Sequence, residues 1–330
     1  METKIIQGFD VFKENRPKIE ETIDKIYNEG ISNIFLIGTG GTYSLMMPWK
    51  YLMDSKSDLP VFIETAAELK LMDHKQLGKG SLCLFASASG DTKEIVDVMG
   101  YCKDRGAQTL SFLVKEECPI AEKSDYVFPT PADDSFVLFF CGLANVILRI
   151  LFLRNEFPKY ERFIDQLYGL GEALEKAVQV SSPKCIFYAA RNYDAPWHLM
   201  VGSGAGWGEA YCYAMCVMEE MQWILTKSIT AAEFFHGTLE LVEKGTPAIL
   251  MFGDDPSRPL MDRTLKFLEN LTDEILVLDT RDIELPVDDE FRGILTPLVL
   301  SVMTKPLSLA FQVERNHSLD VRRYYRQMEY

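Results

Sequence analysis

The sequence predicts an α/β protein made of two tandem three-layer αβα domains, each with a mainly five-stranded parallel sheet. Short apolar runs of strand length alternate with segments of helical period, which is typical of parallel sheets covered on both faces. Several of these runs lead directly into glycine-rich or hydroxyl-rich turns. The turn at 202–206 follows an apolar run as the turn at 38–40 does about half a chain earlier, which indicates a duplicated unit. We expect the domains at residues 1–155 and 156–330.

The first half contains an amphipathic helix, five apolar runs and intervening helices. Gly30 ends the first helix, because glycine commonly follows a helix C-terminus. We expect helices at 8–29, 43–53 and 92–105, and strands at 33–37, 60–63, 82–86, 109–114 and 126–128.

The second half contains fewer clear apolar runs. The stretch 185–191 could be a strand or the end of a helix, and we favour a helix because a turn containing Pro196 follows it. We expect strands at 197–201, 248–252 and 274–278, and helices at 257–271 and 291–313. The segment 228–230 is interpreted as a break after a short helix that begins near Gly208.

Composition excludes several classes of function. The chain has 330 residues, of which 47% are hydrophobic and 25% charged, as in soluble globular proteins. Its net charge of −15 would repel polyphosphate, so we expect no nucleic-acid partner. The seven cysteines form no CxxC or Cys/His metal pattern, which indicates no metal site and a reducing cytoplasmic location. We expect no organic cofactor.

The apolar segment 135–153 is nearly long enough to span a membrane. It contains Asn145 and Arg149, however, and a central arginine is costly in lipid. A helix that is apolar on nearly all sides also occurs in the core of a soluble protein. We therefore expect a buried helix and no membrane span.

Two turns of the first half are candidate phosphate sites. The first turn includes Gly40 and Thr42, and lacks the third glycine of a dinucleotide fingerprint because Tyr43 stands there. The second turn, 87–92, offers three hydroxyls before a helix. Each turn alone could be ordinary helix capping, but two at the ligand-binding edge of one sheet favour a small phosphate ligand. In the second half Asp254 and Asp255 stand at the matching strand end and would repel phosphate.

The stretch 217–237 contains two candidates for proton transfer. Glu220 and His236 lie sixteen positions apart. His236 stands between an aromatic residue and a glycine, a setting that suits an imidazole titrating near neutrality. The alternative is a packed helix followed by a core histidine. His74 is expected to be solvated, and His198 to be a core residue.

These motifs resemble the sugar isomerase (SIS) domain family. The carrying residues are GTGGT at 38–42, SASGDT at 87–92, and a glutamate and a histidine sixteen positions apart. Within that family the chain is most similar to the fructosamine-6-phosphate deglycases. The similar segments are SGAxxG at 203–208, MEEMQWI at 218–224, EFFHG at 233–237, and the tail segments 316–319 and 322–330.

The resemblance implies a reaction, roles and an assembly. A fructosamine 6-phosphate such as fructoselysine 6-phosphate would be hydrolysed to glucose 6-phosphate and an amine. Glu220 would move the proton through an enaminol, and His236 would open the ring or protonate the leaving group. The active site would lie at a homodimer interface, so that His236 could serve the neighbouring subunit. The implied phosphate ligands are Thr42, Ser87, Ser89 and Thr92, and further candidates for contact with the substrate or tail are Ser203, His317 and Tyr330.

Two alternatives remain open. An aldose–ketose isomerase or an amino-sugar-phosphate isomerase/deaminase could use the same glutamate and histidine. A phosphosugar sensor would bind without turnover and would have no need of Glu220. The departures at Ala88, Thr238 and Ser318 from the patterns of the family leave the identity of the amine open.

Overall fold

A computed structural model describes residues 2–131 and 135–329, with side chains described from residue 8 onward. Contacts divide the chain into two compact units, Met1–Glu172 and Ala173–Tyr330. The division falls after the expected position at 155, because the helix Tyr160–Leu167 packs within the first unit. There Arg16 forms ion pairs with Glu161 and Asp165 of that helix.

The first unit has a five-stranded parallel sheet in the order β2-β1-β3-β4-β5. Its strands are β1 (Asn33–Gly38), β2 (Val61–Thr65), β3 (Ser81–Ser87), β4 (Gln108–Leu113) and β5 (Tyr126–Pro129). Its helices are α1 (Glu2–Glu29), α2 (Gly41–Lys56), α3 (Ala66–Met72), α4 (Lys93–Asp104), α5 (Pro119–Lys123), α6 (Ser135–Leu153) and α7 (Tyr160–Leu167). All five expected strands are confirmed.

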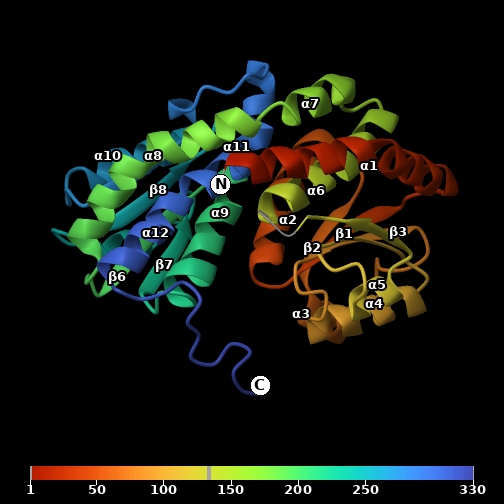
Figure 1. Ribbon diagram of the computed structural model, residues 1–330, viewed down its shortest axis with the longest axis horizontal. Coiled ribbons are helices and arrows are strands. Elements are labelled where there is room, and N and C mark those ends of the chain that lie inside the picture. The colour runs from red at the N-terminus through yellow and green to blue at the C-terminus, as the bar shows by residue number, and fades with distance from the viewer. Residues whose placement is uncertain (1, 132–134, 330) are drawn as a thin grey trace. The chain divides into compact units, whose positions relative to one another are not determined.

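Alternation along the strands separates the two faces of this sheet. Phe35 and Phe85 belong to a core that includes residues of α3, α4 and α5. On the opposite face Phe112 meets Phe12 of α1, and Gly142 of α6 packs directly on its ring. Figure 1 shows α1, α2 and α6 on one side of this sheet and α3, α4 and α5 on the other. The unit is therefore a three-layer αβα structure.

The second unit has a four-stranded parallel sheet in the order β7-β6-β8-β9. Its strands are β6 (Trp197–Gly202), β7 (Leu225–Thr230), β8 (Ala248–Phe252) and β9 (Ile275–Asp279). Its α-helices are α8 (Gly171–Asn192), α9 (Trp207–Cys212), α10 (Arg258–Leu268), α11 (Arg292–Met303) and α12 (Lys305–Glu314). The π-helix η2 (Tyr213–Glu219) and the 3₁₀ turns η1 (Gly204–Gly206), η3 (Thr238–Leu241), η4 (Thr280–Asp282) and η5 (Asp289–Phe291) complete it.

Three expectations for this unit need correction. The second sheet has four strands in the described residues and not about five. The segment 228–230 does not cap a helix but forms the end of β7. That strand is only partly buried and pairs with β6 alone, at the sheet edge, so its sequence LTKSIT lacks the apolar run of a central strand. The expected helix at 291–313 is divided at Thr304 into α11 and α12.

The two most apolar helical stretches, Ser135–Leu153 and Asp289–Glu314, could cross a membrane by length and composition. Of their most apolar windows, 78% and 72% respectively are buried within the protein, as in core helices of soluble proteins. The polar residues of α6 have internal partners. Asn145 donates to the hydroxyl of Tyr168, and Arg149 binds the Asp24 carboxylate of α1.

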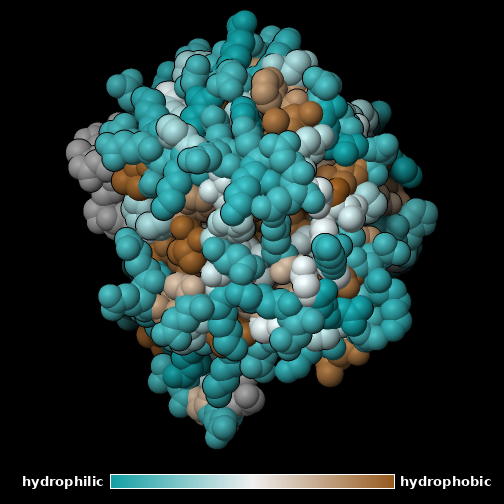
Figure 2. Space-filling model, turned by 90° about the vertical axis from the view of Figure 1, so that its right-hand side faces the viewer, coloured by the Kyte–Doolittle hydropathy of each residue, from teal (hydrophilic) through white to brown (hydrophobic). Residues whose placement is uncertain are grey.

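The outer surface carries most of the charge. Figure 2 shows one face of the molecule as mainly hydrophilic, with small hydrophobic patches among the polar residues.

Removing Asp24 should destabilise the first unit. The Nε and Nη2 atoms of Arg149 lie 2.8 and 2.7 Å from the two Asp24 oxygens, and the arginine side chain is only 13% exposed. Asp24→Ala leaves a mostly buried guanidinium without this partner and is expected to lower the free energy of unfolding by about 2 kcal/mol, measured by urea denaturation. The control Asp54→Ala breaks the more exposed pair with Lys50 and should change it by less than about 0.5 kcal/mol. Equal effects of the two substitutions would contradict this assignment.

Candidate functional site

The order of strands in the first unit identifies its ligand-binding edge. The chain leaves β1 for β2 on one side and reaches β3 on the other, so the strand order reverses between β1 and β3. In open parallel sheets ligands bind at the carboxyl ends of the strands where this reversal occurs. The turn at 38–43 follows β1 and the turn at 87–92 follows β3, which pairs directly with it. We call these two turns the two-turn site.

The first turn is closed by its own threonine. Thr42 Oγ1 accepts from the Thr39 amide at 3.1 Å and donates to the Thr39 carbonyl at 3.0 Å. Gly40 has a φ of +57°, in the left-handed region that glycine tolerates. A Cβ at Gly38 would lie 2.4 Å from the Tyr43 amide nitrogen, so the turn also requires glycine there. The helix α2 starts immediately after Gly40.

In the second turn one hydroxyl holds the turn in shape and two others lie on its partly exposed side. Ser87 is buried, and its hydroxyl accepts from the Gly90 amide at 3.0 Å, which holds the turn. The hydroxyls of Ser89 and Thr92 lie 3.4 Å apart on the partly exposed side. Helix α4 begins at the next residue, Lys93. Ser89 and Thr92 can therefore donate to an anion that the helix dipole also favours.

The corresponding turns of the second unit already hold an anion. Asp255, which follows β8, accepts from the Ala205 amide at 3.3 Å and from the Ser257 amide at 2.9 Å. A Cβ at Gly204 would lie 2.4 Å from an Asp255 carboxylate oxygen. The aspartate therefore lies where a phosphate would meet this glycine turn, and Ser203 is buried beside it. The turn pair of the second unit is therefore occupied by a carboxylate of its own chain.

Glu220 follows the π-helix η2 and precedes β7. Its amide donates to the Met215 carbonyl at 3.0 Å, the long spacing of a π-helix, an arrangement frequent at functional sites. The carboxylate is partly exposed and accepts from Arg322 Nε at 2.8 Å. The neighbouring Glu219 is exposed and accepts from the Thr226 hydroxyl, so the two acids have separate partners.

His236 lies in the turn that follows β7. Its amide donates to the Glu233 carbonyl at 2.9 Å, and the Glu233 amide donates to Thr230, the last residue of the strand. Phe235 packs against Phe267 with ring centroids 5.5 Å apart. The imidazole itself is exposed. It is not a core histidine.

Strand β7 separates the two candidates for proton transfer. Glu220 lies before Leu225 and His236 lies after Thr230, and the six-residue strand spans about 20 Å. The local hydrogen bonds keep each residue near its own end of the strand. One chain therefore does not bring Glu220 and His236 together.

The remaining histidine candidates have different environments. His74 is not solvated as expected but packs on Phe35 and Phe62, with ring centroids 4.9 and 4.5 Å apart. His198 is fully buried in contact with the Tyr188 hydroxyl, and burial lowers its pKa to about 4. His317 packs its ring on Trp223 at 4.3 Å. Tyr330 lies outside the described residues.

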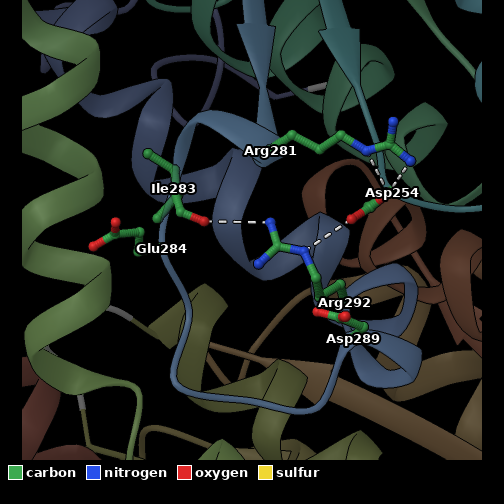
Figure 3. A pocket seen from close by; sticks show the side chains of 6 residues that line it. All are labelled: Asp254, Arg281, Ile283, Glu284, Asp289 and Arg292. Carbon is green, nitrogen blue, oxygen red and sulfur yellow. Dashed lines mark hydrogen bonds and ion pairs between the residues drawn. The ribbon is translucent and has the colours of Figure 1, made fainter.

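A pocket of about 520 Å³ opens beside the turn after β8. Figure 3 shows Arg281 and Arg292 directed at the Asp254 carboxylate from two sides, with Glu284 directed away. Burial raises the pKa of Asp254, but these two hydrogen bonds outweigh it and hold the pKa below its usual value. At this pocket Arg281 and Arg292 are both paired with Asp254.

Two residues of the second unit escape sequence reasoning. Arg322 lies in the tail segment 322–330 that resembles the family, but its contact with Glu220, about a hundred positions away, could not be predicted from the sequence. Glu209, one turn after the glycine turn, is buried and accepts from the Thr304 hydroxyl at 2.9 Å. Burial raises the pKa of the Glu209 carboxyl well above its usual value.

Replacing Glu209 should change the dependence of stability on pH. A carboxyl whose pKa is raised in the folded state contributes its full stability below about pH 4.5 and loses it as the pH rises. Glu209→Gln keeps a side chain that accepts from Thr304 and cannot ionise. The melting temperature should therefore rise relative to the unmodified protein, and rise more at pH 8 than at pH 5. The exposed control Glu269→Gln should show no such difference, and a variant that is less stable at pH 8 would contradict the assignment.

Comparison with known proteins agrees with this fold. The SIS domain family model matches residues 25–154, which lie in the first unit. A phosphosugar isomerase structure from Bacillus subtilis has a TM-score of 0.89 and 29% identity, covering 95% of this chain and 97% of its own. A phosphosugar isomerase structure from Salmonella typhimurium has a TM-score of 0.86 and 26% identity, covering 96% and 99%.

Relatives of known name are similar over nearly the whole chain. The fructosamine deglycase FrlB of Bacillus subtilis is 30% identical over 323 residues, which is 96% of this chain and 98% of the relative. The fructoselysine 6-phosphate deglycase of Escherichia coli is 23% identical over 315 residues, 96% of this chain and 92% of the relative. With the sheet order and the turns described above, these similarities establish that the chain belongs to the SIS-domain family of phosphosugar deglycases and isomerases.

Proposed function

We propose that this enzyme hydrolyses a fructosamine 6-phosphate to glucose 6-phosphate and an amine. The observation that carries the proposal is the hydroxyl-lined turn pair of the first unit, in a chain that is similar to the fructosamine deglycase of Bacillus subtilis over nearly its whole length. In this proposal the Ser89 and Thr92 hydroxyls, which lie 3.4 Å apart on the partly exposed side of the turn, bind the 6-phosphate. Gly40 leaves backbone room at the neighbouring turn, while Thr42 and Ser87 hold the two turns in shape.

The reaction needs one base beside the bound sugar. Glu220 removes a proton from C1 of the opened ketosamine, and the electron pair moves to make an enaminol. A proton returned at C2 leaves a C1=N Schiff base, which water hydrolyses with release of the amine. The phosphate contacts supply binding energy for orientation, and proton transfer by a positioned carboxylate accelerates such steps.

The acid partner is proposed to come from a second copy of the chain. Glu220 and His236 are separated by the length of β7 within one chain, so both can serve one substrate only if the imidazole belongs to the partner subunit of a homodimer. His236 is exposed and follows a turn at the sheet edge, which suits contact with another copy. There it would open the ring or protonate the leaving amine.

Removing the base should separate catalysis from binding. Glu220→Gln is expected to lower kcat by about 10²–10⁴-fold, because the amide cannot accept the C1 proton. Its affinity for glucose 6-phosphate, measured by calorimetry, should stay within about threefold of the unmodified enzyme. The matched control Glu219→Gln should retain activity. Full activity of Glu220→Gln would refute the enzymatic assignment and leave a binding function.

A mixture of two inactive variants should regain activity. In a shared site, a dimer of one Glu220→Gln copy and one His236→Asn copy has one site with both native residues. Random exchange of subunits should restore about a quarter of native activity, since half of the dimers are mixed and each has one intact site of two. The mixture is prepared by reversible dissociation and assayed for glucose 6-phosphate. No recovery, with mixed dimers verified by mass spectrometry, would exclude a shared site.

A further inference from the structure

The C-terminal segment after α12, residues 315–329, packs on the residues around Glu220. It has no regular helix or strand and appears as the dark-blue trace ending at C in Figure 1. Gln222 donates to the His317 carbonyl at 2.9 Å. The Trp223 ring makes two contacts with the segment. It packs against the His317 ring, and the Arg323 guanidinium lies over it, 3.9 Å from the ring centroid. Together with the Glu220–Arg322 pair, these contacts dock the segment directly at the base.

The backbone of Trp223 is strained in this arrangement. Its φ is +56°, a left-handed conformation that a bulky side chain rarely adopts. Such strain persists only where surrounding contacts hold it, and it clusters at ligand-binding sites. The conformation turns the chain between η2 and β7 so that Glu220 and Trp223 both face the segment 315–329.

Arg322 has N–H groups beside Glu220, those on Nη2, that its hydrogen bonds within the described residues do not use. Its Nε binds the carboxylate at 2.8 Å, and its Nη1 donates to the Leu319 and Val321 carbonyls at 2.6 and 3.0 Å. A guanidinium has five N–H groups, and those on Nη2 have no partner among the described residues. The side chain is 16% exposed, so these donors are held in a fixed position next to the base. An N–H group on Nη2 can donate a charge-assisted hydrogen bond to an oxygen of a second carboxylate.

We propose that Arg322 binds the carboxylate of the amino acid carried by the substrate, and so selects ketosamine 6-phosphates formed on an α-amino group. This inference rests on the proposed function. The proton that Glu220 removes is on C1, and in an α-linked substrate the carboxylate is two bonds beyond the nitrogen attached to that carbon. A guanidinium adjacent to the base therefore lies within reach of it.

In an ε-linked lysine conjugate the carboxylate lies further from the reacting nitrogen. The α-carboxylate is four methylene groups further from the nitrogen, so it meets Arg322 with C1 at Glu220 only if the flexible chain folds back, which costs conformational entropy. A chain with a net charge of −15 also needs a local cation to accept an anionic substituent beside a glutamate. Arg322 is the cation that is paired with Glu220 in the described part of the chain.

The test compares three substrates and four proteins. The substrates are the 6-phosphates of fructosyl-glycine, of fructosyl-glycinamide, which lacks the carboxylate, and of ε-fructosyl-lysine. The proteins are the unmodified enzyme, Arg322→Gln, Arg322→Lys and the control Arg326→Gln from the same segment. Release of glucose 6-phosphate gives kcat and KM for each pair.

The unmodified enzyme should prefer fructosyl-glycine 6-phosphate to its amide by about 30-fold in kcat/KM, as expected of a charge-assisted contact. Arg322→Gln should reduce this ratio to about one, mainly by raising KM for the glycine compound. Arg322→Lys should restore part of the preference, and Arg326→Gln should keep all of it.

Other results separate this inference from the proposed function. A ratio near one in the unmodified enzyme, or equal losses on both substrates in Arg322→Gln, would overturn the role of Arg322 and leave the deglycase assignment intact. Release of no glucose 6-phosphate from any of the three substrates would overturn both. Because the ratio in the unmodified enzyme is itself decisive, the test holds even if a variant fails to fold.

Discussion

The parallel pairing of β7 with β6 is the constraint that keeps the two candidates for proton transfer apart. Its register runs from Trp197 opposite Leu225 to Gly202 opposite Thr230, so the two ends of β7 are fixed by six backbone pairings. Glu220 precedes this strand and His236 follows it. Since a strand is a rigid spacer, neither local motion nor side-chain rotation can join the two groups in one chain. A reaction that uses both residues must therefore recruit the imidazole from outside the chain.

The two units illustrate how a duplicated fold can divide its tasks. Both sheets reverse their strand order at an equivalent point, between β1 and β3 and between β6 and β8. In the first unit this point carries the hydroxyls of Ser89 and Thr92. In the second, Asp255 occupies the amides of the glycine turn, and Glu220 meets Arg322 at the opposite end of the sheet. In the proposed function, the first unit therefore binds the anion and the second transfers the proton.

Local pattern predicted most of the fold and part of the site. Central strands such as β3 are continuous apolar runs, because both faces are buried, so these strands and the turns after them could be predicted from the sequence. The edge strand β7 could not be predicted in this way, because it is only partly buried and its polar residues do not form an apolar run. The positions of Glu220 and His236 in sequence gave no sign that a strand separates them. The contacts of Asp255 with Ala205 and of Arg322 with Glu220 join residues far apart in the sequence, and only the folded chain determines them.

The internal carboxylate at the second glycine turn has a consequence for stoichiometry. Because Asp255 is tethered to the turn that it occupies, its effective concentration there far exceeds that of any free phosphate ester in solution. A diffusing sugar phosphate would have to displace it and leave its charge without those amide partners. Under the proposed function, each chain therefore binds a single phosphosugar, although its fold contains the glycine turn twice.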